Sequence, residues 1–209
     1  MNTSDEPIKI ILVADGDSDY SFMVKALMED DELSGLQIKF VKPEEIGLKR
    51  RRGGGHRTLL RDAGIAAIRA AQGWAQGVMA LVDNDGDSRF SFPHDEKCHD
   101  FRECEAWEAI ERINWGSPFK RGAAIVYQAI ESLLLSTRSS FNQQLEDSLF
   151  GDRLKAALYK KQIKTLREKH EAFEQELQKI DVNTIKARSY PRIKRVLHVL
   201  SADRQHTGA

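Results

Sequence analysis

A chain of 209 residues is long enough for one domain with additions, or for a domain that carries a small helical subdomain. Its Lys and Arg residues number 32 and its Asp and Glu residues also number 32, so net charge indicates no partner and only the placement of charges can. No apolar run approaches the length of a membrane span, no signal-peptide pattern is present, and Cys98 and Cys104 are too few for a secreted disulfide scaffold, so we expect a cytoplasmic protein.

The first half of the chain alternates between strand-like and helix-like patterns. The strands are predicted at 8–14, 36–41 and 78–82, and the helices at 19–29 and from about Thr58, as its N-cap, to about Ala75. The first and third of these strands are continuous apolar runs. Such runs are typical of strands that are buried on both faces of a parallel sheet.

The second half begins with a polar loop at 86–101 and then turns mostly helical. A helix is predicted at 101–113, a fourth strand at 123–127 and a helix at 128–135. From Asn142 onward only helices are predicted, and their ranges are 142–150, 152–180, 183–188 and 191–201. The pattern predicts an α/β fold with a mostly parallel four-stranded sheet flanked by helices in residues 1–140, and a helical extension in residues 141–209.

Acidic residues cluster directly after the first and the third predicted strands. They are Asp15, Asp17 and Asp19 after the first strand, and Asp83, Asp85 and Asp87 after the third. Parallel strands end at the same edge of a sheet, where ligands bind in open α/β folds. Carboxylates gathered there repel one another unless a hard cation neutralises them, so the pattern predicts Mg²⁺ or Mn²⁺.

The acidic clusters allow two other interpretations, a calcium-binding loop and simple helix capping. An EF-hand calcium loop starting at Asp83 is disfavoured, because Ser88 stands where that loop needs glycine and His94 stands where it needs a bidentate glutamate. The simpler alternative is that these aspartates only cap the helices that follow them. Two acidic turns that end two buried strands are more than capping requires.

The run Asp15-Gly16-Asp17-Ser18-Asp19 and the run Asp83-Asn84-Asp85 resemble the two motifs of the Toprim superfamily, Glu-Gly-x-x-Asp and Asp-x-Asp. The chain also looks like the small stand-alone, OLD-type Toprim proteins among bacterial and phage-defence nucleases. In those proteins a helix after the fourth strand carries a glutamate within an aliphatic run, as Glu131 does here. One departure is that Asp15 stands where the family usually has glutamate, which would set its carboxylate back by about an ångström.

The resemblance implies a Toprim-like, Rossmann-like fold and a nuclease that uses one or two Mg²⁺ or Mn²⁺ ions. Asp83 and Asp85 would hold an ion, with Asp87 as a further ligand. Asp15 and Asp19 would bind a second ion or transfer protons, and Glu131 would complete the site. The catalytic residues would then be Asp15, Asp19, Asp83 and Asp85. The resemblance also implies an antiviral defence effector that works with an ATPase partner. The sequence has no Walker motif, so any ATP-driven step would come from another chain.

A basic, glycine-rich stretch supports a nucleic-acid substrate, and DNA is expected rather than RNA. Its candidate phosphate contacts are Arg50, Arg51, Arg52, Gly54, His56 and Arg57. Arginine side chains can contact phosphates, and glycine lets backbone amides approach an anion closely. The alternative is an ordinary solvated loop. A homo-oligomer remains open.

Three further possibilities are left open by the sequence. A zinc site from His94, Cys98, His99 and Cys104 is one, although their spacing matches no standard structural site. A phosphatase of the haloacid-dehalogenase type is the second, although Asp19 and Asp87 stand where it needs threonine or valine. The third is a non-catalytic Toprim-like subunit that acts as a scaffold or binds nucleic acid.

Overall fold

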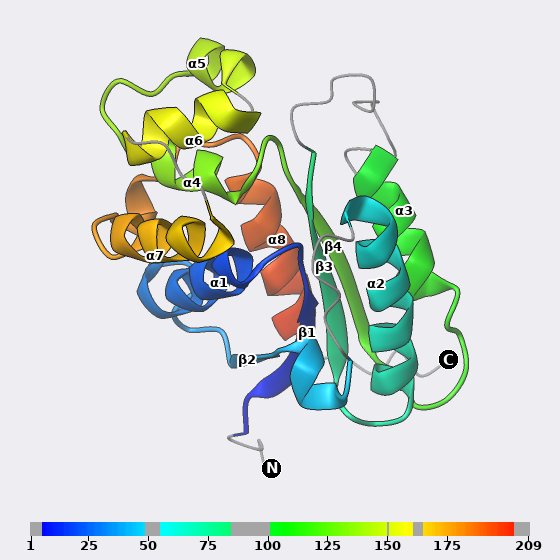
Figure 1. The fold of residues 1–209 in the computed structure, drawn as a ribbon. Coiled ribbons are helices and arrows are strands. Elements are labelled where there is room, and N and C mark those ends of the chain that lie inside the picture. The colour runs from blue at the N-terminus through cyan, green and yellow to red at the C-terminus, as the bar shows by residue number, and fades with distance from the viewer. Residues whose placement is uncertain (1–5, 49–54, 85–100, 150, 161–164, 203–209) are drawn as a thin grey trace.

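Four strands form a single sheet in which every neighbouring pair is parallel (Figure 1). The computed structural model describes residues 6–48, 55–84, 101–149, 151–160 and 165–202. In sheet order the strands are β2 (Ile38–Val41), β1 (Ile8–Val13), β3 (Gly77–Asp83) and β4 (Lys120–Val126). The predicted α/β architecture, with a four-stranded parallel sheet flanked by helices, is confirmed, and the arrangement is Rossmann-like.

The two central strands are the two apolar runs that the sequence shows. Ile10 to Val13 of β1 are buried, as are all residues of β3 before Asp83. Val13 pairs with Ala80, and β3 then continues beside β4 until Asp83 pairs with Val126. Strands β1 and β3 therefore end at one edge of the sheet, which we call the carboxyl edge.

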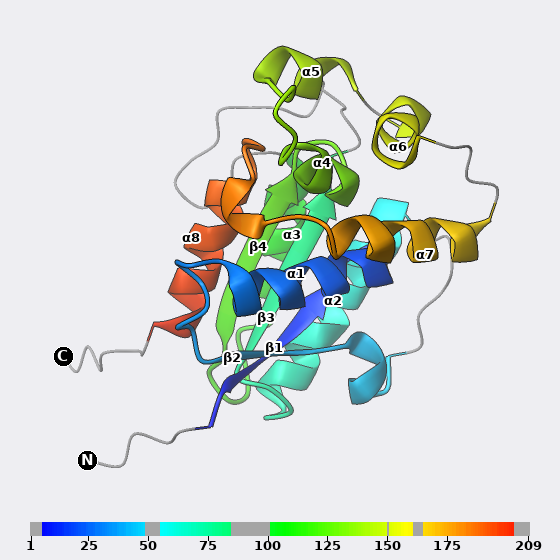
Figure 2. The same ribbon diagram turned by 90° about the vertical axis from the view of Figure 1, so that its left-hand side faces the viewer.

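Helices cover both faces of the sheet, as Figures 1 and 2 show together. One face carries α2 (Gly55–Ala71) and α3 (Phe101–Glu111), while the other carries α1 (Asp17–Glu29), α4 (Ile130–Leu135), α7 (Leu166–Leu177) and α8 (Tyr190–Ser201). Between α4 and α7 the chain forms α5 (Gln143–Ser148) and α6 (Gly151–Tyr159), and α6 packs against α4 and α7. Within the described residues, 3₁₀ turns lie at Pro43–Ile46 and Val182–Thr184.

The apolar core has one part on each face of the sheet. Alanines of α2, among them Ala63, Ala66 and Ala70, pack on one face, where their small side chains let the helix lie close to the strands. On the other face, Phe22 of α1 and Phe173 of α7 belong to the same buried cluster. The helices after residue 140 thus share a core with the first helix of the chain.

Helix α8 lies against β4 at a glycine. A Cβ atom placed on Gly122 would come within 2.7 Å of Val196 Cγ1 and 3.1 Å of Leu200 Cδ1. The absence of a side chain at Gly122 therefore allows α8 to approach the strand. This contact fixes the last helix on the sheet.

The prediction of one helix over 152–180 is wrong. Helix α6 ends at Tyr159, and Lys160 adopts a left-handed conformation with φ of 54°. A new helix then begins after Thr165, whose hydroxyl accepts a hydrogen bond from the Glu168 backbone amide while the Glu168 side chain accepts one from the Thr165 backbone. The sequence carried this capping signal, Thr165-x-x-Glu168, within a run that otherwise favours helix.

Two smaller boundary predictions also differ from the structure. Thr58 is not an N-cap, because α2 already begins at Gly55, whose φ of 53° suits glycine. The short helix predicted at 183–188 is only the 3₁₀ turn at Val182–Thr184.

Within the described residues, no helix is both long enough and apolar enough to cross a membrane.

Candidate functional site

The first acidic motif lies between β1 and α1 at the carboxyl edge. Asp19, in the first turn of α1, is buried, and its Oδ2 accepts a hydrogen bond of 2.8 Å from the Gly16 backbone amide. Capping therefore accounts for one oxygen of this carboxylate. The other oxygen, Oδ1, is also buried and has no hydrogen-bond partner among the described residues.

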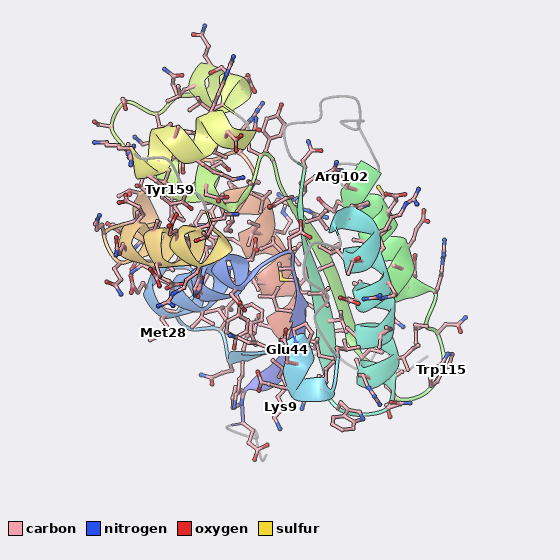
Figure 3. All side chains as sticks on the ribbon, viewed as in Figure 1. Lys9, Met28, Glu44, Arg102, Trp115 and Tyr159 are labelled. Atoms are coloured by element: carbon pink, nitrogen blue, oxygen red, sulfur yellow. The ribbon has the colours of Figure 1, made fainter. Side chains whose placement is uncertain are left out.

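Glu131 lies in α4 and is fully buried. Its Oε1 accepts a hydrogen bond from the Lys169 ammonium at 3.0 Å and one from the Tyr159 hydroxyl at 3.3 Å. Its Oε2 is buried without a partner in the part of the chain that the structure describes. Figure 3 shows Tyr159 on α6 beside α7. Helices α6 and α7 thus hold the carboxylate of α4.

Electrostatics connect these residues into one cluster. Burial, followed by the negative charges of Asp15 and Glu131, raises the pKa of Asp19 to about 7, against the opposing effects of the Gly16 amide and the Lys169 charge. A carboxyl group with this pKa exchanges its proton near neutral pH. That property is common at catalytic sites, although structural ion-pair networks also produce it.

Lys169 is the positive charge of the same cluster. Burial lowers its pKa, but the carboxylate of Glu131, followed by Asp83 and Asp19, outweighs this effect and raises it. The Tyr159 hydroxyl also has a raised pKa, because it is buried and faces Glu131. We call Asp15, Asp19, Asp83 and Glu131, with Lys169, the carboxylate cluster. Four of the six predicted metal ligands belong to it, while Asp85 and Asp87 lie outside the described residues.

The donor chemistry of the carboxylate cluster suits a hard divalent cation. Its ligand atoms would be carboxylate oxygens, and Asp19 Oδ1 and Glu131 Oε2 are buried oxygens that lack partners among the described residues. In that part of the chain, however, no three Asp, Glu, His or Cys side chains come together closely enough to hold an ion. The donor atoms are of the type that Mg²⁺ and Mn²⁺ prefer. Lys169 supplies positive charge to the same carboxylates.

A second set of contacts lies on the other face of the sheet at the same edge. Arg102 of α3 donates from Nη1 to the Asp83 backbone carbonyl at 2.8 Å, and Figure 3 shows it at the upper end of α3. His56 of α2 pairs with Glu105 of α3. Glu103, which is fully buried, forms an ion pair of 2.6 Å with Arg192 of α8, a helix that packs on the opposite face of the sheet. These pairs anchor α3 beside the end of β3.

The predicted phosphate contacts are only partly described. His56 is partly buried and Arg57 is exposed, both in the first turn of α2. Arg50, Arg51, Arg52 and Gly54 lie outside the described residues. Of the four candidate zinc ligands only Cys104 is described, and it is disulfide-bonded. A sulfur atom in a disulfide is not available as a zinc thiolate, whereas His94, Cys98 and His99 are outside the description.

The sequence analysis identified neither Tyr159 nor Lys169 as a partner of Glu131. A signal for Lys169 was present. In α7, which follows the cap at Thr165, the residues Lys169, Phe173 and Leu177 are spaced four residues apart. Residues at this spacing share one helix face, and Phe173 and Leu177 are buried. Lys169 therefore belongs to the inward face of α7.

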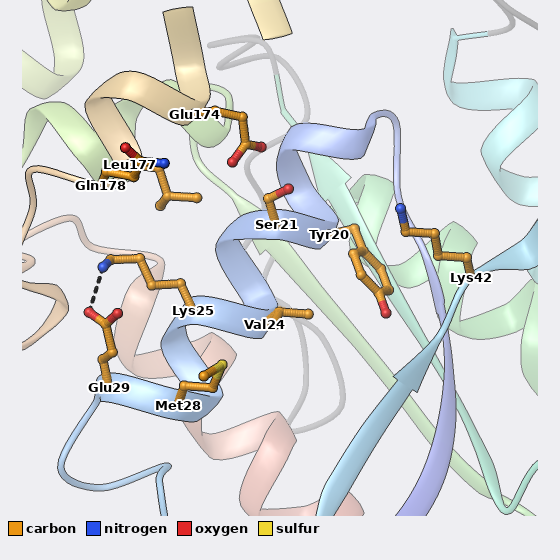
Figure 4. Close-up of a pocket in the computed structure, with 10 residues that line it drawn as sticks. All are labelled: Tyr20, Ser21, Val24, Lys25, Met28, Glu29, Lys42, Glu174, Leu177 and Gln178. Atoms are coloured by element: carbon orange, nitrogen blue, oxygen red, sulfur yellow. Dashed lines mark ion pairs between the residues drawn. The ribbon is translucent and has the colours of Figure 1, made fainter. Parts of the chain in front are cut away.

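A groove lies between α1 and α7, with a volume of about 390 Å³ (Figure 4). Tyr20, Val24 and Met28 of α1 line one side, and Glu174, Leu177 and Gln178 line the other. No member of the carboxylate cluster lines it. The groove is therefore a separate feature from the candidate site.

Comparisons of the chain with protein-family models, with curated proteins and with solved structures found no match.

Proposed function

We propose that the protein is a metal-dependent nuclease that hydrolyses nucleic-acid phosphodiesters at the carboxylate cluster. The observation that carries the proposal is the convergence of Asp19 and Glu131 with the charges of Asp15 and Asp83 at the carboxyl edge. These residues come from three separate parts of the chain. Two of them, Asp19 and Glu131, are buried, and burying two carboxylates near each other is costly unless a cation compensates them. The proposal extends the resemblance to the Toprim superfamily.

Asp15, Asp19, Asp83 and Glu131 would hold Mg²⁺ or Mn²⁺, together with Asp85 and Asp87. A divalent ion bound there supplies charge stabilisation at the phosphate and lowers the pKa of a bound water. Asp19, whose pKa is about 7, is suited to exchange protons near neutral pH. Tyr159 and Lys169 fix the position of Glu131 through Oε1 and leave Oε2 for a ligand.

The proposed substrate is DNA, contacted by the basic residues that precede and open α2. Arg57 is exposed in the first turn of α2, and His56 lies next to it at the carboxyl edge. An ATPase partner, and a role as an effector in antiviral defence, are proposed from the Toprim resemblance alone.

The test is cleavage of plasmid, single-stranded DNA and RNA with Mg²⁺ or Mn²⁺, using wild type and the double variant Asp83→Ala/Asp85→Ala. A matched control is Asp152→Asn, since Asp152 is a fully exposed aspartate in the first turn of α6. We expect cutting that needs the metal, is lost in the double variant and is kept in the control. Metal-independent cutting, or cutting that the double variant retains, would contradict the proposal.

A second candidate function is a non-catalytic subunit that binds nucleic acid. The specific observation in its favour is that Lys169 already neutralises Glu131, while no three carboxylates of the described residues lie closely enough to hold an ion. Wild type that binds DNA but does not cut it with either metal would support this candidate over the nuclease.

A further inference from the structure

A histidine and a glutamate form a close pair at the carboxyl edge, on the face opposite Glu131. His56 Nε2 lies 2.6 Å from Glu105 Oε2, and the two side chains are 22% and 34% exposed. An ionised carboxylate can only accept a hydrogen bond, so Nε2 is the donor and the ring orientation is fixed. In a neutral imidazole the other nitrogen, Nδ1, is then an acceptor.

His56 Nδ1 is buried and has no hydrogen-bond partner among the described residues. A buried polar atom without a partner is costly to the fold. A strut between α2 and α3 would need only the Nε2 contact. The unused Nδ1 acceptor is therefore the feature that a structural role leaves unexplained, and a proton donor placed there would satisfy it.

Helix α3 relates the pair to the end of β3, which carries Asp83. Arg102 and Glu105 are three residues apart, so they share one helix face at a separation of about one turn, roughly 5 Å. Arg102 donates to the Asp83 backbone carbonyl at 2.8 Å, and Glu105 holds His56. One face of α3 thus connects the histidine with the strand end that carries Asp83.

We propose that His56, positioned by Glu105, is the proton acceptor for the hydrolytic water, an inference that rests on the proposed nuclease function. The water oxygen forms a bond to phosphorus, and the bond from phosphorus to the leaving ester oxygen breaks with its electron pair kept on that oxygen. The proton of the water passes to His56 Nδ1 and from there to solvent, while the leaving oxygen takes a proton from solvent. Glu105 stabilises the imidazolium that forms in between.

The experiment measures nicking of supercoiled plasmid with Mn²⁺ by wild type, His56→Ala and Glu105→Gln, each with and without added imidazole. His198→Ala is the control, because His198 is an exposed histidine in the last turn of α8. Melting temperatures are recorded for all variants. We expect His56→Ala to lower the rate roughly 10²- to 10⁴-fold, with partial recovery in imidazole. Glu105→Gln should lower it at least about tenfold, and His198→Ala should not change it.

Three results would overturn the inference. If wild type nicks plasmid and His56→Ala does so equally well, the pair of His56 and Glu105 takes no part in cleavage, while the nuclease proposal stands. If His56→Ala is slow, has a lowered melting temperature and is not rescued by imidazole, the pair is a structural strut. If wild type does not nick plasmid at all, the proposed nuclease function fails, and the proposed role of His56 fails with it.

Discussion

Lys169 on α7 and Glu131 on α4 form an ion pair of 3.0 Å in which the glutamate is fully buried. The pair joins the helical extension to the helix that follows the fourth strand. Because the charges of Asp83 and Asp19 also act on Lys169, this one ammonium group compensates carboxylates from three different elements. The extension therefore contributes to the electrostatics of the candidate site as well as to the core.

Replacing Lys169 by methionine should destabilise the protein, because Glu131 would be left buried without its cation. We expect the free energy of unfolding to fall by about 3 kcal/mol at neutral pH, measured by urea denaturation. The double variant Lys169→Met/Glu131→Gln should recover much of the loss. The control is Lys179→Met, since Lys179 forms a more exposed pair of 2.7 Å with Glu176 whose loss should cost less than about 1 kcal/mol. Equal stability of Lys169→Met and wild type would contradict this account.

The raised pKa of Asp19 predicts that the stability of the folded protein falls as the pH rises. Its pKa is about 7 in the folded protein, whereas an unfolded aspartate loses its proton near its ordinary value of 3.8. Between these two values the folded state holds more protons than the unfolded state, so the free energy of unfolding decreases with pH. Asp19→Asn should remove this decrease and be more stable than wild type at pH 8, by on the order of a few kcal/mol. Parallel pH profiles for the two proteins would show that Asp19 is not responsible.

Divalent metal should reverse the effect of pH. An ion that binds the ionised carboxylates stabilises only the folded state, and at one hundred times its dissociation constant it adds about 2.7 kcal/mol. We expect Mn²⁺ to raise the melting temperature of wild type at pH 8, and to raise that of Asp19→Asn/Glu131→Gln much less. The exposed-site variant Asp152→Asn should respond as wild type does. A rise of the same size in all three proteins would indicate non-specific binding.

Substitution of Gly122 tests the packing of α8 on β4. In Gly122→Ala the new methyl group would meet Val196, whose branched side chain has little freedom to move, so we expect a loss of about 1–3 kcal/mol. Gly35→Ala is the control, because nothing lies within 4 Å of a Cβ atom at Gly35. Urea denaturation of both variants measures the difference. A Gly122→Ala variant as stable as wild type would mean that α8 shifts at little cost.

The sheet could be predicted from the sequence because its information is local. Continuous apolar runs mark β1 and β3 as strands with two buried faces, and an aspartate follows each run. Parallel strands end at one edge, so the placement of both aspartate-bearing strand ends at that edge followed from topology. These steps require only periodicity and the direction of the strands.

The partners of Glu131 could not be predicted in the same way. Tyr159 reaches Glu131 only because α6 ends there and the chain turns at Lys160, within a stretch whose composition favours uninterrupted helix. The pairing of His56 with Glu105 likewise depends on how α2 packs against α3. Such contacts are decided by tertiary packing, which local patterns do not encode.

The most direct test of the central claim is the rate of metal-dependent DNA cleavage by Glu131→Gln. A matched control is Glu146→Gln, since Glu146 is also a buried glutamate with an ion-pair partner, Arg188 at 3.1 Å, but it lies on α5 outside the carboxylate cluster. The account predicts that Glu131→Gln keeps its fold by circular dichroism and cleaves at least about 100-fold more slowly than wild type, whereas folded Glu146→Gln cleaves normally. Cleavage by Glu131→Gln at the wild-type rate would contradict it.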